Sequence, residues 1–285
     1  MCARFALFDE KKEMSSLIES TWAAATVMIQ SPSTRGTGFL VGRPVGKDQW
    51  RIYLVTNKHV LDPDTLKRRA LTSVRLYLNV EKNGQVVGEQ LDYLLEEQSV
   101  SRVREHPDSD VDVLAIDVVP LFNARKDIRN KLVGEDLFGV AAKRKELDIT
   151  AGEEIIVVGY PSGIRQGLTN YPIIRQGIIA TRIGEELHEE LPQPGGGTKT
   201  RVSRAFLIDG ATIPGSSGSP VVLKPVIGRQ QANTIMMGTT HPVLLGIVAE
   251  TRFAAIDTGA GIIPGFAGLG FVFDVETIVE VLDLF

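Results

Sequence analysis

The chain has 285 residues, of which 43 % are hydrophobic and 23 % are charged, values close to those of ordinary globular domains. This length allows one large domain or two smaller ones, and the composition excludes a collagen, a coiled coil and an intrinsically disordered chain. The chain has 31 Lys and Arg residues and 35 Asp and Glu residues, which gives a net charge of −4. Because it lacks an excess of basic residues to neutralise phosphates, we expect no nucleic-acid partner.

The cysteine content and the N-terminus indicate the compartment. Cys2 is the only cysteine, which excludes an intrachain disulfide and a cysteine-based metal site and fits a reducing compartment. The first residues, MCARFALFDEKKEMSS, lack the apolar core of a secretory signal, and no apolar run is long enough to span a membrane. We therefore expect a cytoplasmic protein with no membrane partner, no metal and no organic cofactor.

In chain order, residues 1–25 form an N-terminal arm in which the charges of residues 10–20 are compatible with a short helix. From residue 26 onward the chain consists of short apolar runs separated by Gly, Pro, Asn and Asp, a pattern typical of β-sandwiches and β-barrels. The eleven runs are ATVMIQ, TGFLVG, WRIYLVTN, SVRLYLNV, VDVLAIDVV, EEIIVVGYP, QGIIATRIG, RAFLIDGA, PVVLK, LLGIVAET and GFVFDV.

Helical patterns are weak in the middle of the chain, apart from short turns after His59 and within residues 119–131. Residues 184–200 have the charged and Gly-rich composition of a loop. Near the C-terminus, the spacing of apolar residues predicts a helix; they are Ile278, Val279, Val281, Leu282 and Phe285. Charges replace the apolar runs at 127–149, which predicts two β-rich halves, at 26–135 and 136–285.

The segment PGSSGSP, residues 214–220, has the small residues of a tight turn and precedes an apolar run. A nucleophilic serine needs such a turn, because the backbone amides must converge on the oxyanion that forms during acyl transfer. A plain Gly/Ser turn between two strands would have the same composition. The segment alone therefore leaves both interpretations open.

A serine nucleophile also needs a base and a group that orients it. Of the four histidines, His59 ends an apolar run at a polar turn, whereas His106, His188 and His241 have the sequence context of surface residues. Asp112 opens the run VLAI at the edge of a core, and we favour it over Asp110 because an orienting carboxylate must be held in fixed geometry. Asp108 lies in the preceding polar turn and Asp117 at the far end of the run.

The ordered set TGFLVG, LVTNKHV, DVDVLAID, PGSSGSP, LLGIVAE and GLGFVF resembles the trypsin-like (chymotrypsin-fold) serine proteases, and among them the bacterial HtrA-like branch. The resemblance covers residues 26–275. It implies an all-β fold of two six-stranded Greek-key β-barrels that act as one protease domain. By position, it also implies that His59 is the general base, Asp112 its orienting carboxylate and Ser217 the nucleophile, with the amides of Gly215 and Ser217 as the oxyanion hole.

The departures from the family pattern concern activation. Ser216 stands where the secreted digestive enzymes carry an aspartate that receives a freed N-terminus, and no IVGG-like start is visible near residue 26. We also expect no PDZ-like module after the protease domain. The site is therefore expected to be preformed, or to be ordered by a substrate or by a regulatory protein that contacts the arm or the 184–200 loop.

The resemblance gives the specificity pocket as Ala211, Ala249, Glu250, Thr251 and Gly270. Ala211 stands six residues before the nucleophile, where trypsin carries an acid, so this pocket does not favour Lys or Arg. Thr251 replaces a glycine that would leave the pocket open, which predicts a narrow apolar pocket for small or aliphatic residues. Glu250 either recognises a basic residue elsewhere on the substrate or is a solvated surface charge.

Three functions are therefore in competition. The first is a serine endopeptidase that acts on protein or peptide substrates. The second is a catalytically silent trypsin-like fold that serves as a protein-binding module, and the third is a protease that stays latent until a partner remodels its loops. An α/β-hydrolase is disfavoured because the elbow of that fold has the pattern GxSxG and its triad order starts with serine. A cysteine protease is disfavoured because the nucleophile position is a serine.

Overall fold

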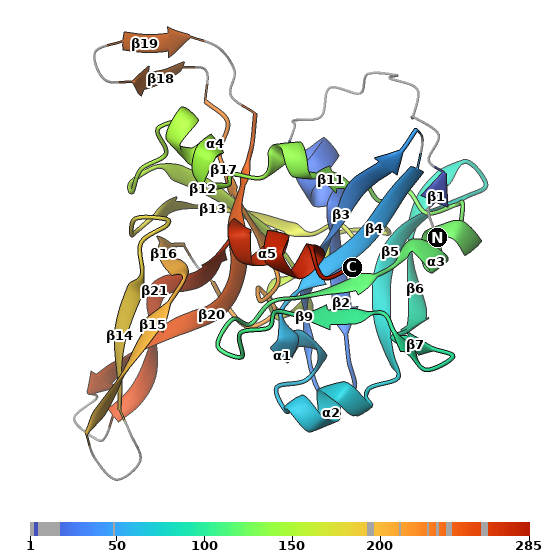
Figure 1. Ribbon diagram of the computed structural model, residues 1–285, viewed down its shortest axis with the longest axis horizontal. Coiled ribbons are helices and arrows are strands. Elements are labelled where there is room, and N and C mark those ends of the chain that lie inside the picture. Colours follow the sequence, from blue (N-terminus) through green and yellow to red (C-terminus); the bar gives the residue numbers. More distant parts are fainter. Residues whose placement is uncertain are drawn as a thin grey trace.

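The computed structural model describes residues 3–4, 18–47, 49–192, 197–210, 212–226, 228–231, 234–237, 241–257 and 262–285. Its β-strands form two lobes that lie side by side, with the first half of the chain in one lobe and the second half in the other (Figure 1). This confirms the predicted all-β, two-barrel architecture.

The first lobe is built on a sheet that has nine strands within the described residues. Six of them follow one another in the order β6 (Gln85–Leu94), β5 (Ser73–Lys82), β2 (Thr26–Gln30), β3 (Arg35–Gly46), β4 (Gln49–Thr56) and β10 (Leu114–Asp117). The short strands β9 (Val103–Glu105), β1 (Ala3–Arg4) and β11 (Val133–Gly134) add to the six that the resemblance implies. The amide of Arg102 donates to the carbonyl of Leu95 at 2.8 Å, which links the residue before β9 to the residue after β6.

Alternation of apolar and polar residues explains the strands of this lobe. In β5, Val74, Leu76, Leu78 and Val80 are buried, and they pack in one cluster with residues from β2, β3, β4 and β10. Successive side chains of a strand point to opposite faces, so every second residue of SVRLYLNV reaches the core. Strand β6 was missed by the sequence analysis because Gly, Gln and charged residues interrupt the apolar residues of QVVGEQLDYL.

The second lobe is a closed six-stranded barrel. Its strands follow one another as β12 (Glu154–Gly159), β13 (Ile173–Ile179), β16 (Ala205–Asp209), β21 (Ile262–Asp274), β20 (Leu244–Asp257) and β17 (Pro220–Leu223). Buried apolar residues from these strands fill its interior, among them Val157, Phe206 and Val248. Short hairpins extend the lobe: β14 (Leu187–Pro192) with β15 (Thr198–Ser203), and β18 (Gly228–Gln231) with β19 (Thr234–Met237).

A third apolar cluster joins the two lobes. It combines Phe39 and Val55 of the first sheet with Val222 and Phe273 of the barrel. Trp22, which is fully buried, enters this cluster from the short helical turn Ile18–Ala23. Of the helix expected at residues 10–20, only residues 18–20 lie within the described residues. The interface between the lobes is thus an apolar core, which holds side chains from both lobes in fixed relation.

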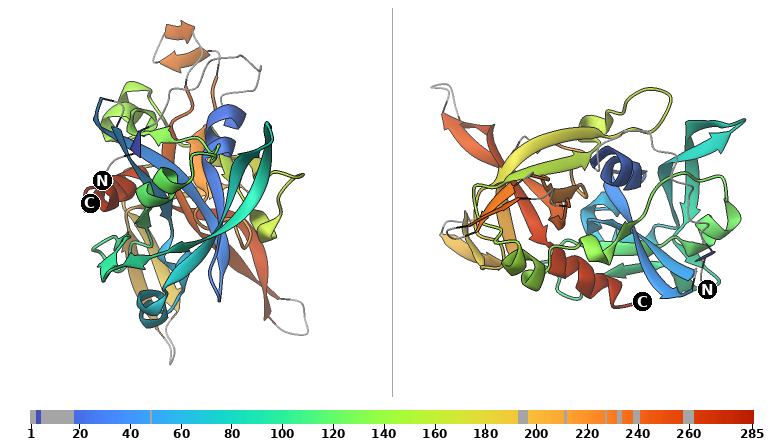
Figure 2. Two further views of the ribbon diagram at one scale, coloured as in Figure 1. Left: turned by 90° about the vertical axis from the view of Figure 1, so that its right-hand side faces the viewer. Right: turned by 90° about the horizontal axis from the view of Figure 1, so that it is seen from above.

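The C-terminal helix α5 (Val275–Leu282) lies across the two lobes, as Figure 1 and the right-hand view of Figure 2 show. Ile278, Val281 and Leu282 are buried on its inner face, which confirms the predicted helix. The Asp274 side chain caps its first turn by accepting a hydrogen bond from the amide of Glu276 at 3.3 Å. The Glu280 carboxylate contacts both His106 of the first lobe at 2.8 Å and Arg204 of the second at 2.7 Å.

The remaining helices are short. They are α1 (Lys58–Leu61), α2 (Thr65–Ala70), α3 (Val119–Ala124), α4 (Ala141–Glu146) and the single turns Glu135–Leu137 and Pro161–Gly163. Helices α1 and α3 are the turns predicted after His59 and within 119–131. Strand β11 pairs with β3 of the first lobe, whereas the amide of Gly139 bonds to the carbonyl of Leu244 in the barrel. The chain therefore crosses from the first lobe to the second between Gly134 and Gly139. Among the described residues, none of the helices has both the length and the apolarity needed to cross a membrane.

The loop predicted at residues 184–200 is wrong for most of its length, because β14 and β15 pair there as a hairpin. Thr200 bonds to Glu190 across the two strands at 2.7 Å, and Arg201 lies 3.9 Å from Glu189. Composition alone predicts a loop because both strands are polar, but opposite charges and hydroxyls on facing positions stabilise a polar strand pair. The hairpin lies beside the long strands β20 and β21 at one end of the second lobe (Figure 1).

Candidate active site

His59 and Asp112 lie together at the edge of the first lobe. His59 belongs to α1, directly after β4 ends, and its Nδ1 forms a short hydrogen bond with Asp112 Oδ2. The backbone amide of His59 also donates to Asp112 Oδ1 at 3.1 Å, so one carboxylate holds both the ring and the main chain of the histidine. A ring nitrogen fixed in this way leaves the other nitrogen, Nε2, available to a reaction partner.

The two residues before His59 attach the same loop. Asn57 Nδ2 donates to the carbonyl of Asp112 at 2.6 Å. The Lys58 ammonium is buried and donates to the carbonyls of His106 and Asp108, at 3.0 and 2.9 Å. Burial lowers the pKa of Lys58, because the charged form loses its hydration. The run Asn-Lys-His thus binds the Asp112 loop at three successive residues.

His106 is not a surface residue, contrary to the sequence prediction. It is 6 % exposed, and its Nδ1 accepts a hydrogen bond from the amide of Asp108 at 3.1 Å. Its proton is therefore on Nε2, which donates to Glu280 at 2.8 Å. Partners that come from α5, far away in the sequence, explain why sequence context failed here. His188 and His241 are exposed, as expected.

The segment PGSSGSP forms a tight turn at the end of the second lobe that faces the first. The amide of Ser216 donates to the carbonyl of Ile213 at 2.9 Å, and Gly215 has a φ of +93°, the conformation that a type II turn requires at this position. A Cβ on Gly215 would lie 2.5 Å from the carbonyl oxygen of Tyr160. Glycine is therefore required here both for its conformation and for space.

The turn leaves two amides unbonded. The carbonyl of Pro214 accepts a hydrogen bond from the amide of Ser162 at 2.7 Å. Because the C=O and N–H of a trans peptide point in opposite directions, the amide of Gly215 points away from Ser162. Among the described residues, no acceptor bonds to the amide of Gly215 or to that of Ser217. The two amides predicted to form an oxyanion hole are thus free to bind an acceptor.

The three serines of the turn differ in accessibility. Ser216 is 1 % and Ser219 is 0 % exposed, whereas Ser217 is partly exposed. The Ser217 hydroxyl donates to the carbonyl of Ala249 at 3.1 Å, and within the described part of the chain no hydrogen bond joins it to His59. Ser217 is therefore the serine of this turn that a substrate can reach, and its hydroxyl is hydrogen-bonded to the carbonyl of Ala249.

Thr37 of β3 connects the turn to the first lobe, a role that the sequence analysis missed. Its amide donates to the carbonyl of Ser217 at 2.8 Å, and its hydroxyl donates to the carbonyl of Gly215 at 2.9 Å. The same hydroxyl accepts from the amide of Tyr160 at 3.0 Å. Gly218 approaches Thr37 so closely that a Cβ there would lie 1.7 Å from the Thr37 carbonyl oxygen.

Three of the predicted pocket residues lie on facing strands. Thr251 of β20 pairs with Gly270 of β21, and Ala249 lies buried two residues before Thr251. The Thr251 hydroxyl donates to the carbonyl of Thr212 at 3.1 Å, and a Cβ on Gly270 would lie 2.6 Å from Thr212 Cγ2. Thr212, which was not predicted, thus contacts both of these residues. Ala211 lies outside the described residues.

Glu250 is engaged by arginines of this chain. Its carboxylate bonds to Arg201 at 3.1 Å and to Arg252, and both guanidinium groups stack on the ring of Phe271, at 4.8 and 4.6 Å from its centroid. Arg252 also contacts Glu189 at 2.6 Å. These ion pairs tie the β14–β15 hairpin to β20, which is a structural use of the Glu250 charge.

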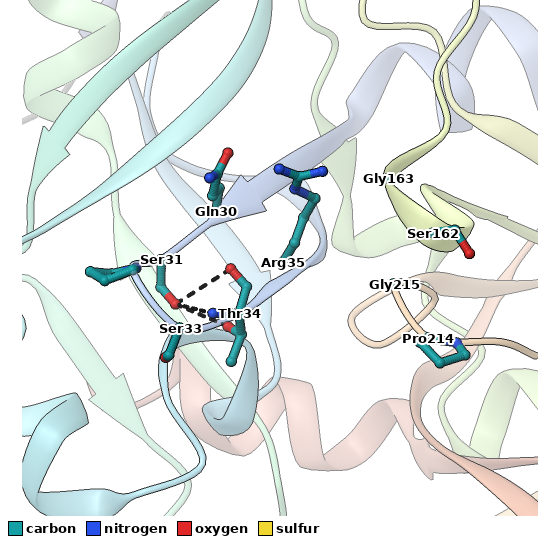
Figure 3. A pocket seen from close by; sticks show the side chains of 10 residues that line it. Gln30, Ser31, Ser33, Thr34, Arg35, Ser162, Gly163, Pro214 and Gly215 are labelled. Carbon is teal, nitrogen blue, oxygen red and sulfur yellow. Dashed lines mark hydrogen bonds between the residues drawn. The ribbon is translucent and has the colours of Figure 1, made fainter.

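A groove of about 380 Å³ is lined in part by Gly215. The turn after β2 and the start of β3 form one wall, and the Ser162 and Pro214 segments form the other (Figure 3). Arg35 extends toward the second wall, where its Nη1 lies 2.8 Å from the position of a Cβ on Gly163. Among the described residues, no group of three or more His, Cys, Asp and Glu side chains gathers as metal ligands.

Residues 36–224, well over half of the sequence, match the family model of the trypsin-like peptidase domain. The chain belongs to this family. The matched range includes His59, Asp112 and Ser217 and ends within the second lobe. None of the curated proteins has a matching sequence.

Two solved structures illustrate how this trypsin-like peptidase compares with others. The active form of the Rv3671c protease from M. tuberculosis is 16 % identical with a TM-score of 0.49, and the alignment covers 98 % of this chain and 93 % of that one. Deg5 is 19 % identical with a TM-score of 0.47, and the alignment covers 93 % of this chain and 89 % of that one.

Proposed function

We propose that this trypsin-like peptidase is a serine endopeptidase with His59, Asp112 and Ser217 as its triad. One observation carries the proposal: the accessible serine of the turn carries one of two unbonded amides and lies across the lobe interface from a histidine whose Nδ1 is held by a carboxylate. A nucleophile, a base with its orienting group and an oxyanion site are the three parts that acyl transfer by serine requires.

The reaction starts when the Ser217 hydroxyl leaves the Ala249 carbonyl and donates to His59 Nε2. As Ser217 Oγ attacks the scissile carbonyl carbon, its proton passes to Nε2, and the Asp112 carboxylate stabilises the imidazolium. The oxyanion of the tetrahedral intermediate accepts hydrogen bonds from the amides of Gly215 and Ser217. His59 then protonates the leaving amine, and the acyl group stays on Ser217.

Deacylation repeats these steps with water. His59 Nε2 takes a proton from the water as the water oxygen attacks the acyl carbon, and the same two amides stabilise the second oxyanion. The imidazolium returns the proton to Ser217 Oγ when the tetrahedral intermediate collapses. The product carboxylic acid leaves, and the serine and histidine regain their initial protonation states.

In this proposal the substrate backbone pairs with β20 as an added strand. A substrate amide that donates to the Ala249 carbonyl would compete with the Ser217 hydroxyl for that acceptor. Substrate binding would then release the hydroxyl toward His59, so the substrate itself completes the site. Because the turn already has its amides unbonded, this rotation is the activation step that the proposal requires, and a regulatory partner would act by promoting it.

The residue before the scissile bond would lie against the described pocket residues Ala249, Thr251 and Gly270. The close contact of Thr212 with Gly270 supports a narrow pocket and hence cleavage after small or aliphatic residues. The leaving part of the substrate would occupy the groove beside Gly215 that Figure 3 shows. We place the enzyme in the cytoplasm, since its single cysteine suits a reducing compartment.

A fluorophosphonate probe tests this function. Wild-type protein should be labelled, Ser217→Ala should not, and Ser219→Ala, which changes a buried serine of the same turn, should be labelled like the wild type. Circular dichroism of each variant controls for folding. If wild-type protein never reacts and its partner binding is unchanged in Ser217→Ala, the chain is a silent binding module. If it reacts but degrades unfolded casein only after a partner is added, the enzyme is latent.

A further inference from the structure

A half-buried arginine, two of whose guanidinium nitrogens are fully buried, lies behind the nucleophile turn. Arg175 belongs to β13, where it pairs with the buried Val157 of β12, so both side chains point to the inside of the barrel. Its Nη2 donates to the hydroxyl of Ser216 at 2.8 Å. The Ser216 hydroxyl accepts a second hydrogen bond from the amide of Ile213 at 3.3 Å. The guanidinium therefore bonds to the residue between the two amides of the proposed oxyanion hole.

The surroundings of Arg175 give no sign that its charge stabilises the fold. Its Nε and Nη1 atoms are buried and have no hydrogen-bond partner among the described residues. Burial lowers the pKa of Arg175, and no carboxylate within the described chain offsets that effect. A buried cation without a counter-ion destabilises a fold. By contrast, the fully buried arginines of the described residues, Arg68 and Arg144, are each paired with carboxylates.

The contact with Arg175 is made by Ser216, the residue directly before the proposed nucleophile. In the digestive relatives an aspartate stands at this position and receives a cationic N-terminus after cleavage, whereas here Ser216 receives the cation of Arg175 from within the same chain. We infer that Arg175 is a positioning residue for the oxyanion hole, which holds Ser216 so that the turn is formed without any cleavage of the chain. This inference rests on the serine peptidase function proposed above.

Two physical effects follow from this placement. The hydrogen bond restrains Ser216, and thereby the orientation of the peptides that carry the Gly215 and Ser217 amides. The positive charge also lies in a low-dielectric interior, where it favours negative charge developing on the other side of the turn. Both effects act in the transition state more than in substrate binding, so they should appear in kcat and leave KM nearly unchanged.

The test compares Arg175→Met, Arg175→Lys and Ser216→Ala in peptide hydrolysis and fluorophosphonate labelling. Removing one oxyanion donor from a serine protease costs about 10²–10³ in kcat, so Arg175→Met, which acts through the turn, should cost about 10–100-fold with KM changed less than about threefold. Arg175→Lys should recover part of the loss. Combining Arg175→Met with Ser216→Ala should cost no more than Arg175→Met alone, because both remove the same contact.

Arg144→Met is the matched control, since it removes a buried arginine of the same lobe that pairs with Asp274 instead of the turn. It should lower the unfolding midpoint and leave kcat of the folded protein unchanged. If Arg175→Met does not fold, Arg175→Lys and Ser216→Ala serve instead, and each should lower kcat with KM nearly unchanged. An extension placed before Met1 should also leave kcat unchanged.

Wild-type kcat in Arg175→Met, additive losses in the double variant or an active site blocked by the N-terminal extension would each overturn the inference. In those cases the wild-type enzyme still reacts with the probe, so the proposed function stands. A wild-type chain that neither hydrolyses peptides nor reacts with the probe would instead overturn both.

Discussion

The hydroxyl of Thr37 in the first lobe donates to the carbonyl of Gly215 in the second, at 2.9 Å, although 178 residues separate them in the sequence. Thr37 is fully buried, and its own carbonyl accepts a hydrogen bond from Thr56 at 2.6 Å. The proposed oxyanion hole is therefore fixed from two sides, by Thr37 of the first lobe and by Arg175 of the second. A site at the junction of two lobes requires such contacts, because neither lobe alone determines its geometry.

Replacing Thr37 by Val keeps the shape of the side chain and removes the hydroxyl, which donates to the carbonyl of Gly215 and accepts from the amide of Tyr160. We expect kcat to fall about 10-fold with little change in KM, since the loss of a buried hydrogen bond costs roughly 1–3 kcal/mol and here loosens the turn. Steady-state kinetics on a cleavable peptide measures the effect. Thr37→Ser, which keeps the hydroxyl, should stay close to wild type; equal losses in both variants would assign the role to packing.

The motifs from which the sequence predicts the candidate site are local. The run LVTNKHV places His59 where a strand ends, and PGSSGSP contains the glycines that a turn with positive φ needs at Gly215 and Gly218. The strands were found where every second residue is buried, as in β5, and missed where both faces are polar, as in the β14–β15 hairpin.

The residues that the sequence did not reveal owe their roles to distant contacts. Arg175 lies in the run IIRQGII, where a charged residue normally faces solvent, and only the closure of the barrel turns it toward Ser216. His106 is buried because α5 returns from the end of the chain to meet it. No pattern within ten residues of either position carries this information.

The Lys58 ammonium should hold Asp112 in place through the carbonyls of His106 and Asp108. In Lys58→Met the apolar stem remains but both carbonyls lose their donor, so the free energy of unfolding should fall by about 1–3 kcal/mol. The looser loop should also lower kcat about 10-fold, far less than the roughly 10⁴-fold expected of Asp112→Asn in a triad. Urea unfolding and peptide kinetics give the two quantities. Unchanged kcat with reduced stability would limit Lys58 to a structural role.

Asp274 should make stability depend on pH. Burial raises its pKa to about 6, although Arg144 opposes the shift; Glu276 and Arg204 are the other charged groups near it. Because this pKa lies above the value of 3.8 for a free aspartate, the folded protein binds more protons between pH 4 and 6. The contribution of Asp274 to the free energy of unfolding is thus greatest below pH 4 and declines as pH rises to 6, by at most about 1.4 kcal/mol per pH unit.

Asp274→Asn removes this titration together with its charge interaction with Glu276, whereas the remaining titrating groups are shared with the wild type. Urea titrations at pH 4, 5, 6, 7 and 8 give the unfolding free energy of both proteins. The value for the wild type should fall relative to that of Asp274→Asn from pH 4 to 6, and the difference should then stay level. A constant difference over the whole series would show that the pKa of Asp274 is not raised.

Thr251 should limit the size of the residue that the enzyme accepts before the scissile bond. Its hydroxyl bonds to the Thr212 carbonyl, and it faces Gly270 across the strand pair, so the side chain narrows the proposed pocket. Thr251→Gly should therefore improve kcat/KM for peptides with Phe or Leu at this position by about 10-fold relative to Ala, since one or two methylene groups in an apolar pocket are worth about 1–3 kcal/mol.

Thr251→Ser keeps the hydrogen bond to Thr212 and removes one methyl group, and should give a smaller shift in the same direction. A peptide library profiled with wild-type enzyme and both variants measures the preference directly. Cleavage by the wild type after Phe, Arg or Lys would contradict a narrow apolar pocket before any variant is made. An unchanged profile in Thr251→Gly would place the size limit elsewhere, with Thr212 as the nearest side chain that could impose it.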